Sequence, residues 1–266
     1  MKHRSIWVTF AAFLVFTFLF SQDFLARLAW QKYRAPGIAL ALASQDAELL
    51  IKLGHYYFNG GAYNLSLAEQ AYKKSLRANP KIILAHYQLA RVYFVKGENN
   101  LAIEEINKEL DINPANLRAL YVRGLIYGYR NSPGDLALAE DDFRRFTAWA
   151  PTEWAGHNDL AWILEKQGKH EEAKISLLAA LEKASNGTQN PWLWNGIGVA
   201  ELNLKDYSMA KKSFERAREL AKNLTLSDWQ KAYPGNDPTA YESGIREFQN
   251  AIAKNLRKTD SVDNTI

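Results

Sequence analysis

Small and apolar side chains recur along the chain at a spacing of about 34 residues. Aligning the chain on its prolines reveals this period, because Pro80 and Pro114 are 34 residues apart and Pro114 and Pro151 are 37 apart. One column of the alignment contains Gly54, Ala90, Gly124, Ala161 and Gly198, and a second contains Ala68, Ala102, Ala139, Ala173 and Ala210. A third column, four residues after the second, contains Tyr72, Ile106, Phe143, Leu177 and Phe214.

Each period predicts a pair of antiparallel helices. Small residues let two helices approach closely, a larger side chain packs between them, and proline ends one helix and begins the next unit. A single pair cannot bury its apolar face, so the five pairs are expected to stack around a continuous core.

These columns resemble the tetratricopeptide repeat, with its pattern Trp-x-x-Leu-Gly-x-x-Tyr, then Ala-x-x-x-Phe, then Pro. The most similar period supplies Trp194, Ile197, Gly198, Ala210, Phe214 and Ala217. The resemblance covers residues 47–222 and implies an all-α, right-handed superhelical solenoid of five helical hairpins. The chain departs from the pattern by extra residues near 59–61 and 131–135, and by Arg123, which stands where the third unit should carry leucine.

Residues 1–25 have the pattern of a membrane anchor. A short basic start, with Lys2 and Arg4, precedes residues 6–20, which carry no charge. The candidate signal-peptidase sites at 19–21 and 24–26 begin with Leu19 and Phe24, bulky residues where a small one belongs, which favours an uncleaved transmembrane helix over a cleaved export signal. The basic start favours a cytoplasmic N-terminus and an extracytoplasmic domain. The chain thus resembles signal-anchored, single-pass tetratricopeptide proteins of bacterial inner membranes.

Residues on both sides of the five repeats, 26–46 and 223–266, do not follow the repeat pattern. Residues 26–46 are predicted to form a helix or linker before the first hairpin. Residues 223–258 are predicted to contain a capping helix that begins at Asp237 and Pro238, because solenoids need a terminal element over their last apolar face. Residues 259–266 are expected to be a frayed tail.

The sequence offers little support for catalysis, and we predict no catalytic residues, cofactor or metal. It contains no cysteine, which excludes thiol chemistry and disulfides. Phosphate-binding and nucleophile-elbow motifs are missing, and the histidines are scattered. The acidic run 140–142 is interpreted as a solvated helix face paired with neighbouring arginines. The net charge of +4 is modest for this length, so no nucleic-acid partner is predicted.

The resemblance also implies where a partner binds, because the first helix of each tetratricopeptide hairpin lines a concave groove. Transferred position by position, the groove residues are Tyr87, Gln88, Arg91, Phe94, Arg118, Tyr121, Tyr129, Asn158, Trp162, Trp192 and Asn195. Rings and amides suit an extended peptide or a protein surface. Trp162, Trp192, Asn158, Asn195 and Tyr129 are expected to form the centre of the site, with the alternative that Trp192 fills an interface between hairpins.

The predicted function is therefore a non-catalytic, membrane-tethered scaffold for protein–protein interaction in envelope assembly, secretion or quality control. One alternative is a solenoid that binds or processes glycans, which would need paired carboxylates across a cleft; Asp159 and Glu165 are the acidic groove candidates. Another is a cytoplasm-facing import or adaptor receptor.

Overall fold

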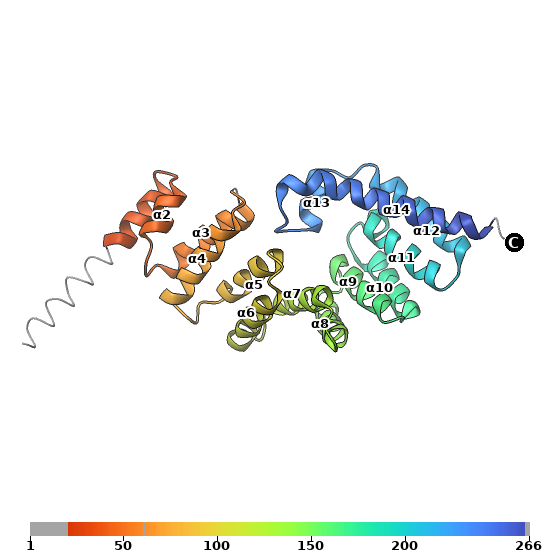
Figure 1. Ribbon diagram of the computed structural model, residues 1–266, viewed down its shortest axis with the longest axis horizontal. Coiled ribbons are helices and arrows are strands. Elements are labelled where there is room, and N and C mark those ends of the chain that lie inside the picture. Colours follow the sequence, from red (N-terminus) through yellow and green to blue (C-terminus); the bar gives the residue numbers. More distant parts are fainter. Residues whose placement is uncertain (1–20, 61, 264–266) are drawn as a thin grey trace, which may run out of the picture. The chain divides into compact units, whose positions relative to one another are not determined.

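The computed structural model describes residues 21–60 and 62–263, and within these ranges the protein is helical and contains no β-strand (Figure 1). The chain forms two compact units, one ending at Asn113 and the other beginning at Pro114. Both units are built from helical hairpins, as the periodic columns predict.

The first unit contains two hairpins preceded by shorter helices. Residues 21–31 are helical. The elements that follow are α2 (Pro36–Leu42), α3 (Ala47–His55), the π-helix η1 (Tyr56–Gly60), α4 (Leu65–Ala78), α5 (Ala85–Val95) and α6 (Asn99–Ile112). Helix α3 pairs with α4 and α5 pairs with α6, and the two hairpins pack together through α4 and α5.

The second unit contains three hairpins and a C-terminal extension. The hairpins are α7 (Leu117–Arg130) with α8 (Asp135–Trp149), α9 (Trp154–Lys166) with α10 (His170–Lys183), and α11 (Pro191–Asn203) with α12 (Tyr207–Ala221). The 3-10 helix η2 (Gly187–Gln189) precedes α11, and the extension comprises α13 (Leu226–Ala232), the 3-10 helix η3 (Pro238–Ala240) and α14 (Tyr241–Asp263). The prediction of five all-α hairpins is confirmed.

The columns mark the contact between the two helices of each hairpin. A Cβ atom added to Gly54 would lie 2.4 Å from the ring of Tyr72, and one added to Gly198 would lie 2.6 Å from the ring of Phe214. All five alanines of the second column are fully buried. The first-column glycines are therefore required because an aromatic ring occupies the space that a side chain would need.

Arg123 departs from the repeat pattern because it pairs with a buried carboxylate. Its Nε and Nη2 atoms each donate a hydrogen bond of 2.8 Å to the two oxygens of Asp142, which is only 1% exposed. The expectation that the run 140–142 is a solvated face is thus wrong for Asp142. Glu140 does pair with Arg144 as expected, at 2.8 Å. Sequence alone could not show that α7 supplies a guanidinium opposite one carboxylate of the run.

Glu109, a charged residue within an otherwise uncharged column, caps a neighbouring helix. Leu84, which precedes α5, adopts a left-handed conformation with φ of 73° and has no side chain able to cap the helix. The fully buried Glu109 carboxylate instead accepts hydrogen bonds from the backbone N–H groups of Leu84, at 3.0 Å, and Tyr87, at 3.4 Å. Helix N-termini favour such a negative charge.

The insertion near 131–135 forms a closed turn between α7 and α8. Asn131 and Gly134 both have positive φ, and Arg130 donates two hydrogen bonds, of 2.9 and 2.7 Å, to Asp135. The backbone N–H of Ser132 donates a further bond to Asp135 at 2.9 Å. The extra residues are thus accommodated without disturbing either helix.

Helix α14 covers the last hairpin, in the position expected of a capping helix. Its Leu256 lies in one apolar cluster with Ala210 and Phe214 of α12, and Ile252 lies in a second cluster with the end of that helix. The extension therefore buries the apolar face that α12 would otherwise expose.

The boundaries of this extension differ from those predicted. Asp237 caps the 3-10 helix η3, so that α14 itself begins at Tyr241. Helix α14 then continues to Asp263, and Thr259 is buried with its hydroxyl donating to the carbonyl of Leu256 at 2.7 Å. The tail expected at 259–266 is thus helical as far as Asp263. Helix α13 was not anticipated.

The predicted transmembrane residues 6–20 lie outside the described residues. None of the helices in 21–60 and 62–263 has the length and apolar character needed to cross a membrane. Residues 21–25, which the anchor prediction included, begin a helix that contacts the first hairpin region. Asp23 accepts hydrogen bonds from the backbone N–H groups of Ser44, at 2.7 Å, and Gln45, at 3.1 Å.

Candidate functional site

Four of the predicted groove residues lie on α5 in the first unit: Tyr87, Gln88, Arg91 and Phe94. The Arg91 guanidinium lies 4.8 Å from the ring centre of Phe58 and 5.8 Å from that of Tyr87. It also donates a hydrogen bond of 2.9 Å to the Gln88 side chain, which is only 8% exposed. Gln88 therefore positions Arg91 instead of presenting its amide to a partner, and Phe94 is partly buried.

The other seven predicted residues lie on the first helices of the second unit: Arg118, Tyr121 and Tyr129 on α7, Asn158 and Trp162 on α9, and Trp192 and Asn195 on α11. Arg118 is exposed near the start of its helix, and Asn195 is partly buried. The remaining five fall into three groups with different surroundings.

Tyr129 and Trp162 form an aromatic platform between α7 and α9. Their ring centres are 5.0 Å apart, and Tyr129 is 63% exposed. Gly128 makes the contact possible, because a Cβ atom there would lie 2.6 Å from the Trp162 ring. On the other helix, the Lys166 ammonium lies 4.4 Å from the centre of the Trp162 ring and donates to the Gly128 carbonyl at 2.9 Å. The platform is thus held in place while one ring remains largely accessible.

Asp159 lies one turn before this platform on α9. It accepts a hydrogen bond of 2.6 Å from the Tyr121 hydroxyl and one of 3.2 Å from the Asn158 amide. Burial raises the pKa of Asp159 to about 6, against the effect of these two bonds, which lower it. Partial desolvation of the Tyr129 hydroxyl, whose ring remains largely accessible, raises the pKa of Tyr129, and the Asp159 charge adds to that effect. A partly buried carboxylate therefore lies among tyrosines next to the platform.

Trp192 belongs to a third group, in which the repeats meet the C-terminal extension. Its ring stacks on Trp154 at 5.4 Å and on Phe248 of α14 at 5.4 Å, and lies 6.3 Å from Trp229 and 6.2 Å from Tyr233. We refer to these five side chains as the C-terminal aromatic cluster. Because Trp192 is only 8% exposed, it is packed beneath the extension, and the expectation that it faces a partner directly does not hold in this structure.

Sequence reasoning missed four members of this cluster as site residues: Trp154, Phe248, Trp229 and Tyr233. A usable signal existed for the last two, because they stand four residues apart, one turn of a helix, in a segment outside the repeats. Nothing in the repeat pattern indicates that this segment returns to the first helices α9 and α11.

The acidic pair proposed for glycan chemistry is not arranged for it. Glu165 accepts a hydrogen bond of 2.6 Å from Asn203 and lies 2.7 Å from His170 Nδ1, so its Oε2 atom is engaged within the repeats. Asp159 and Glu165 lie on the same helix and not across a cleft. In the part of the chain that the structure describes, no three His, Asp or Glu side chains gather in a way suited to a metal ion.

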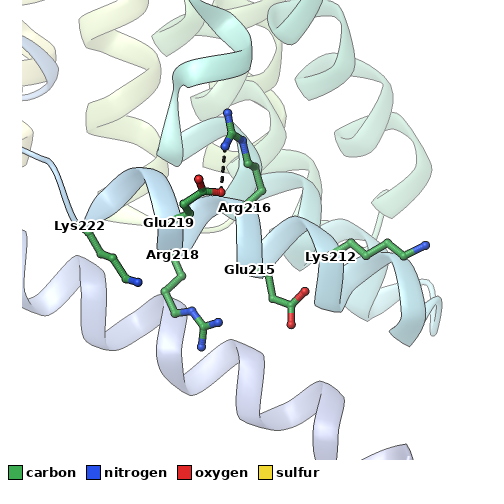
Figure 2. Close-up of a pocket in the computed structure, with 6 residues that line it drawn as sticks. All are labelled: Lys212, Glu215, Arg216, Arg218, Glu219 and Lys222. Atoms are coloured by element: carbon green, nitrogen blue, oxygen red, sulfur yellow. Dashed lines mark hydrogen bonds and ion pairs between the residues drawn. The ribbon is translucent and has the colours of Figure 1, made fainter.

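A charged face on α12 offers no alternative site. Figure 2 shows its six side chains: Lys212, Glu215, Arg216, Arg218, Glu219 and Lys222. Arg216 bonds Glu219 at 2.9 Å and points away from Arg218 and Glu215 (Figure 2). Arg216 and Lys212 thus point away from Arg218 and Lys222, so the four basic groups share no point at which an anion could be held.

Two segments of the sequence match a known repeat family. The sequence profile of the tetratricopeptide repeat matches residues 156–184 and 193–224, which correspond to the hairpins α9–α10 and α11–α12. Two consecutive hairpins of the second unit are thus tetratricopeptide repeats. Stacked tetratricopeptide hairpins form a scaffold for protein–protein interaction.

Two curated proteins are similar in sequence to part of the chain. The type IV pilus assembly protein PilF of Pseudomonas aeruginosa is 26% identical over 142 residues, which cover 52% of this chain and 54% of PilF. The BBSome complex member BBS4 of Bos taurus is 25% identical over 154 residues, covering 56% of this chain and 27% of BBS4. The chain thus spans about half or less of the length of these relatives.

Solved structures share the fold. PilW, a type IV pilus biogenesis factor, has a TM-score of 0.59 at 19% identity, over 81% of this chain and 99% of PilW. MamA has a TM-score of 0.56 at 20% identity, over 71% and 95% of the two chains. YrrB, described as a tetratricopeptide protein with an unusual peptide-binding site, has a TM-score of 0.57 at 18% identity, over 71% and 93%. At these identities the likeness shows the fold alone.

Proposed function

We propose that this protein is a non-catalytic, membrane-tethered tetratricopeptide scaffold, and that it holds an extended segment of a partner protein on the first helices of its second unit. The observation that carries the proposal is the aromatic platform. Tyr129 is 63% exposed although its ring lies against Trp162, and large rings exposed beside polar groups are typical of protein interaction sites.

The polar groups around the platform suit a peptide backbone and basic side chains. Asp159 lies one turn from Trp162 and can attract a cationic group. On α11, the next first helix, the buried Oδ1 of Asn195 has no hydrogen-bond donor among the described residues. Rings provide contact area with few rotatable bonds, and amides and carboxylates bond the backbone of an extended chain.

The membrane tether is supported by the sequence of residues 6–20 and by the segment that follows it. Residues 21–31 form a helix whose Asp23 bonds the backbone next to the first hairpin, so an anchor would join the folded part without a long linker. We place the repeats outside the cytoplasm, on a bacterial inner membrane, because of the basic N-terminus. Anchoring would raise the local concentration of the scaffold at the membrane.

The similarity to PilF and the fold shared with PilW support a role in assembling an envelope machine of the pilus kind. The partner would then be a protein of that machine.

An affinity pull-down from detergent-solubilised membranes tests the binding site. Wild type is compared with a Tyr129→Ala/Trp162→Ala double variant and with Trp149→Ala as the matched control, since Trp149 is also an exposed tryptophan, 51% accessible, but lies on the second helix α8. Proteins captured by wild type and Trp149→Ala should be lost with the double variant, which should melt within a few degrees of wild type. Equal capture by all three proteins would refute the site.

Two measurements test the tether and its orientation. A reporter fused after Ile266 that is active only outside the cytoplasm supports the proposed orientation, and one active only inside contradicts it. The N-terminus of the purified protein, determined by mass spectrometry, should lie before residue 21. An N-terminus beyond Ser21 would show that the segment is a cleaved export signal.

A further inference from the structure

The chain places its own segment against the aromatic side chains of the second unit. This segment comprises α13 and the residue after it, 226–233. Trp229 lies 6.3 Å from Trp192 and 6.5 Å from Phe248, and Tyr233 lies 6.2 Å from Trp192. Trp229 and Tyr233 also contact each other at 4.5 Å, so the two rings act as one unit. Beneath them, Trp192 stacks between Trp154 and Phe248.

Tyr233 reaches toward the groups that we assign to partner binding. Burial raises the pKa of Tyr233 to about 12, and the Asp159 carboxylate adds to this shift with a smaller effect from Tyr129. The pKa of Tyr121 is also raised by burial, with contributions from Asp159 and Tyr233. The phenol of the segment thus shares its surroundings with the carboxylate and tyrosines of α7 and α9.

The segment has little structure of its own to hold it there. Helix α13 is seven residues long and none of its residues is buried, whereas isolated helices shorter than about 12–15 residues are marginal in water. A capping box between Thr225 and Asp228 stabilises its first turn, and it packs mainly against the start of α14 (Figure 1). The Trp229 ring lies over Gly244 of α14, where a Cβ atom would be 2.4 Å from it. The rings of Trp229 and Tyr233 therefore provide most of the contact that holds residues 226–233 on this surface.

Segments held by few buried contacts open at low free energy, while the surface beneath them stays folded. The surface here is formed by three long helices, α9, α11 and α14, which are packed in the repeats and on the last hairpin. Opening of residues 226–233 would expose Trp192 and Phe248 without unfolding a hairpin.

We propose that residues 226–233 are a replaceable internal ligand of this aromatic surface, and that a partner segment takes their place with two aromatic side chains four residues apart. The second half of this inference rests on the proposed function. We infer the side chains of the partner segment from residues 226–233, because Trp229 and Tyr233, four residues apart, already fit this surface.

A peptide supplied in trans tests the internal ligand without the natural partner. The probe is a fluorescein-labelled peptide of residues 223–236, and the proteins are the full-length wild type and a full-length Trp229→Ala/Tyr233→Ala variant. The variant should bind the peptide because its own segment no longer occupies the surface. A tethered segment competes at an effective concentration on the order of 1 mM, so a peptide with a Kd of about 50 µM for the variant should bind wild type about 20-fold more weakly.

Two controls make the result specific. A Gln230→Ala/Lys231→Ala variant changes the same helix at exposed positions, and it should resemble wild type. A peptide with alanine at the two ring positions should bind none of the proteins. Binding of the intact peptide to no protein, or equally to all of them, would overturn the inference.

Hydrogen exchange of the wild type provides a second measurement if the double variant fails to fold. The amides of residues 229–233 should exchange at least tenfold faster than those in the middle of α14, and equal protection of the two segments would overturn the inference. The outcomes are also separable from those of the pull-down. Peptide binding with an unchanged pull-down would refute the partner site alone, whereas a platform-dependent pull-down without peptide binding would refute the internal ligand alone.

Discussion

Replacing Arg123 with leucine, the residue that the repeat pattern favours, should destabilise the protein. The substitution removes both hydrogen bonds of 2.8 Å to Asp142 and leaves a carboxylate that is 1% exposed without its cation. Breaking a buried ion pair in this way costs about 3–5 kcal/mol. Because the Arg123 side chain is 21% exposed and water can reach the site, we expect the lower end, about 3 kcal/mol.

The loss should depend on pH in a defined direction. Burial already raises the pKa of Asp142 although Arg123 lowers it, so removing Arg123 raises that pKa further. A carboxyl group with a higher pKa in the folded state than in the unfolded state stabilises the fold at low pH, and this contribution is lost as the pH rises through the folded pKa. The variant should therefore be closer to wild type at pH 5 than at pH 8.

Urea denaturation followed by circular dichroism measures the effect, and thermal melts should show a fall of about 6–12 °C. Arg145→Ala is the matched control, because Arg145 lies 4.0 Å from Asp141 with both side chains exposed, and such pairs contribute about 0–1 kcal/mol. An Arg123→Leu/Asp142→Leu variant should recover most of the loss. A single Arg123→Leu variant as stable as Arg145→Ala at pH 8 would refute the reasoning.

Two further predictions concern packing and titration. Gly198→Ala places a methyl group 2.6 Å from the buried Phe214 ring and should lower the free energy of unfolding by about 1–3 kcal/mol; an unchanged urea midpoint would contradict the packing described for this hairpin. Asp159→Asn should stabilise the protein at neutral pH, because the pKa of Asp159 rises to about 6 on folding from an ordinary value of 3.8. Because its pKa is higher in the folded state, Asp159 destabilises the fold of the wild type as the pH rises from about 4 to 6, by up to about 3 kcal/mol. Asn does not ionise, so the variant keeps this stability at neutral pH. A stability difference between the two proteins that is constant from pH 4 to 7 would exclude this shift.

The hairpins could be predicted from the sequence because their contacts are local. The two helices of a hairpin are close in the chain, so the ring that packs against Gly198 is Phe214, 16 residues later. The spacing is also 16 between Ala90 and Ile106 and between Ala161 and Leu177, and it is 18 or 19 in the two units that carry extra residues. The small residues and the larger apolar residues that follow them therefore identify each hairpin without knowledge of the rest of the protein. The candidate residues Tyr129 and Trp162 could be found in the same way, since the repeat pattern assigns both to first helices.

Contacts that depend on tertiary structure could not be predicted. Arg123 stood out as an irregularity, but only the packing of α7 on α8 shows that it neutralises Asp142 and that this carboxylate is buried. Trp192 occupies a groove position by the repeat pattern, yet the extension that follows the last hairpin folds back over it. The residues that do so, Trp229 and Phe248, lie outside the period. Sequence periodicity determined how each hairpin folds, and tertiary structure decided which parts of the surface the chain covers itself, because that cover comes from non-repeating residues distant in the sequence.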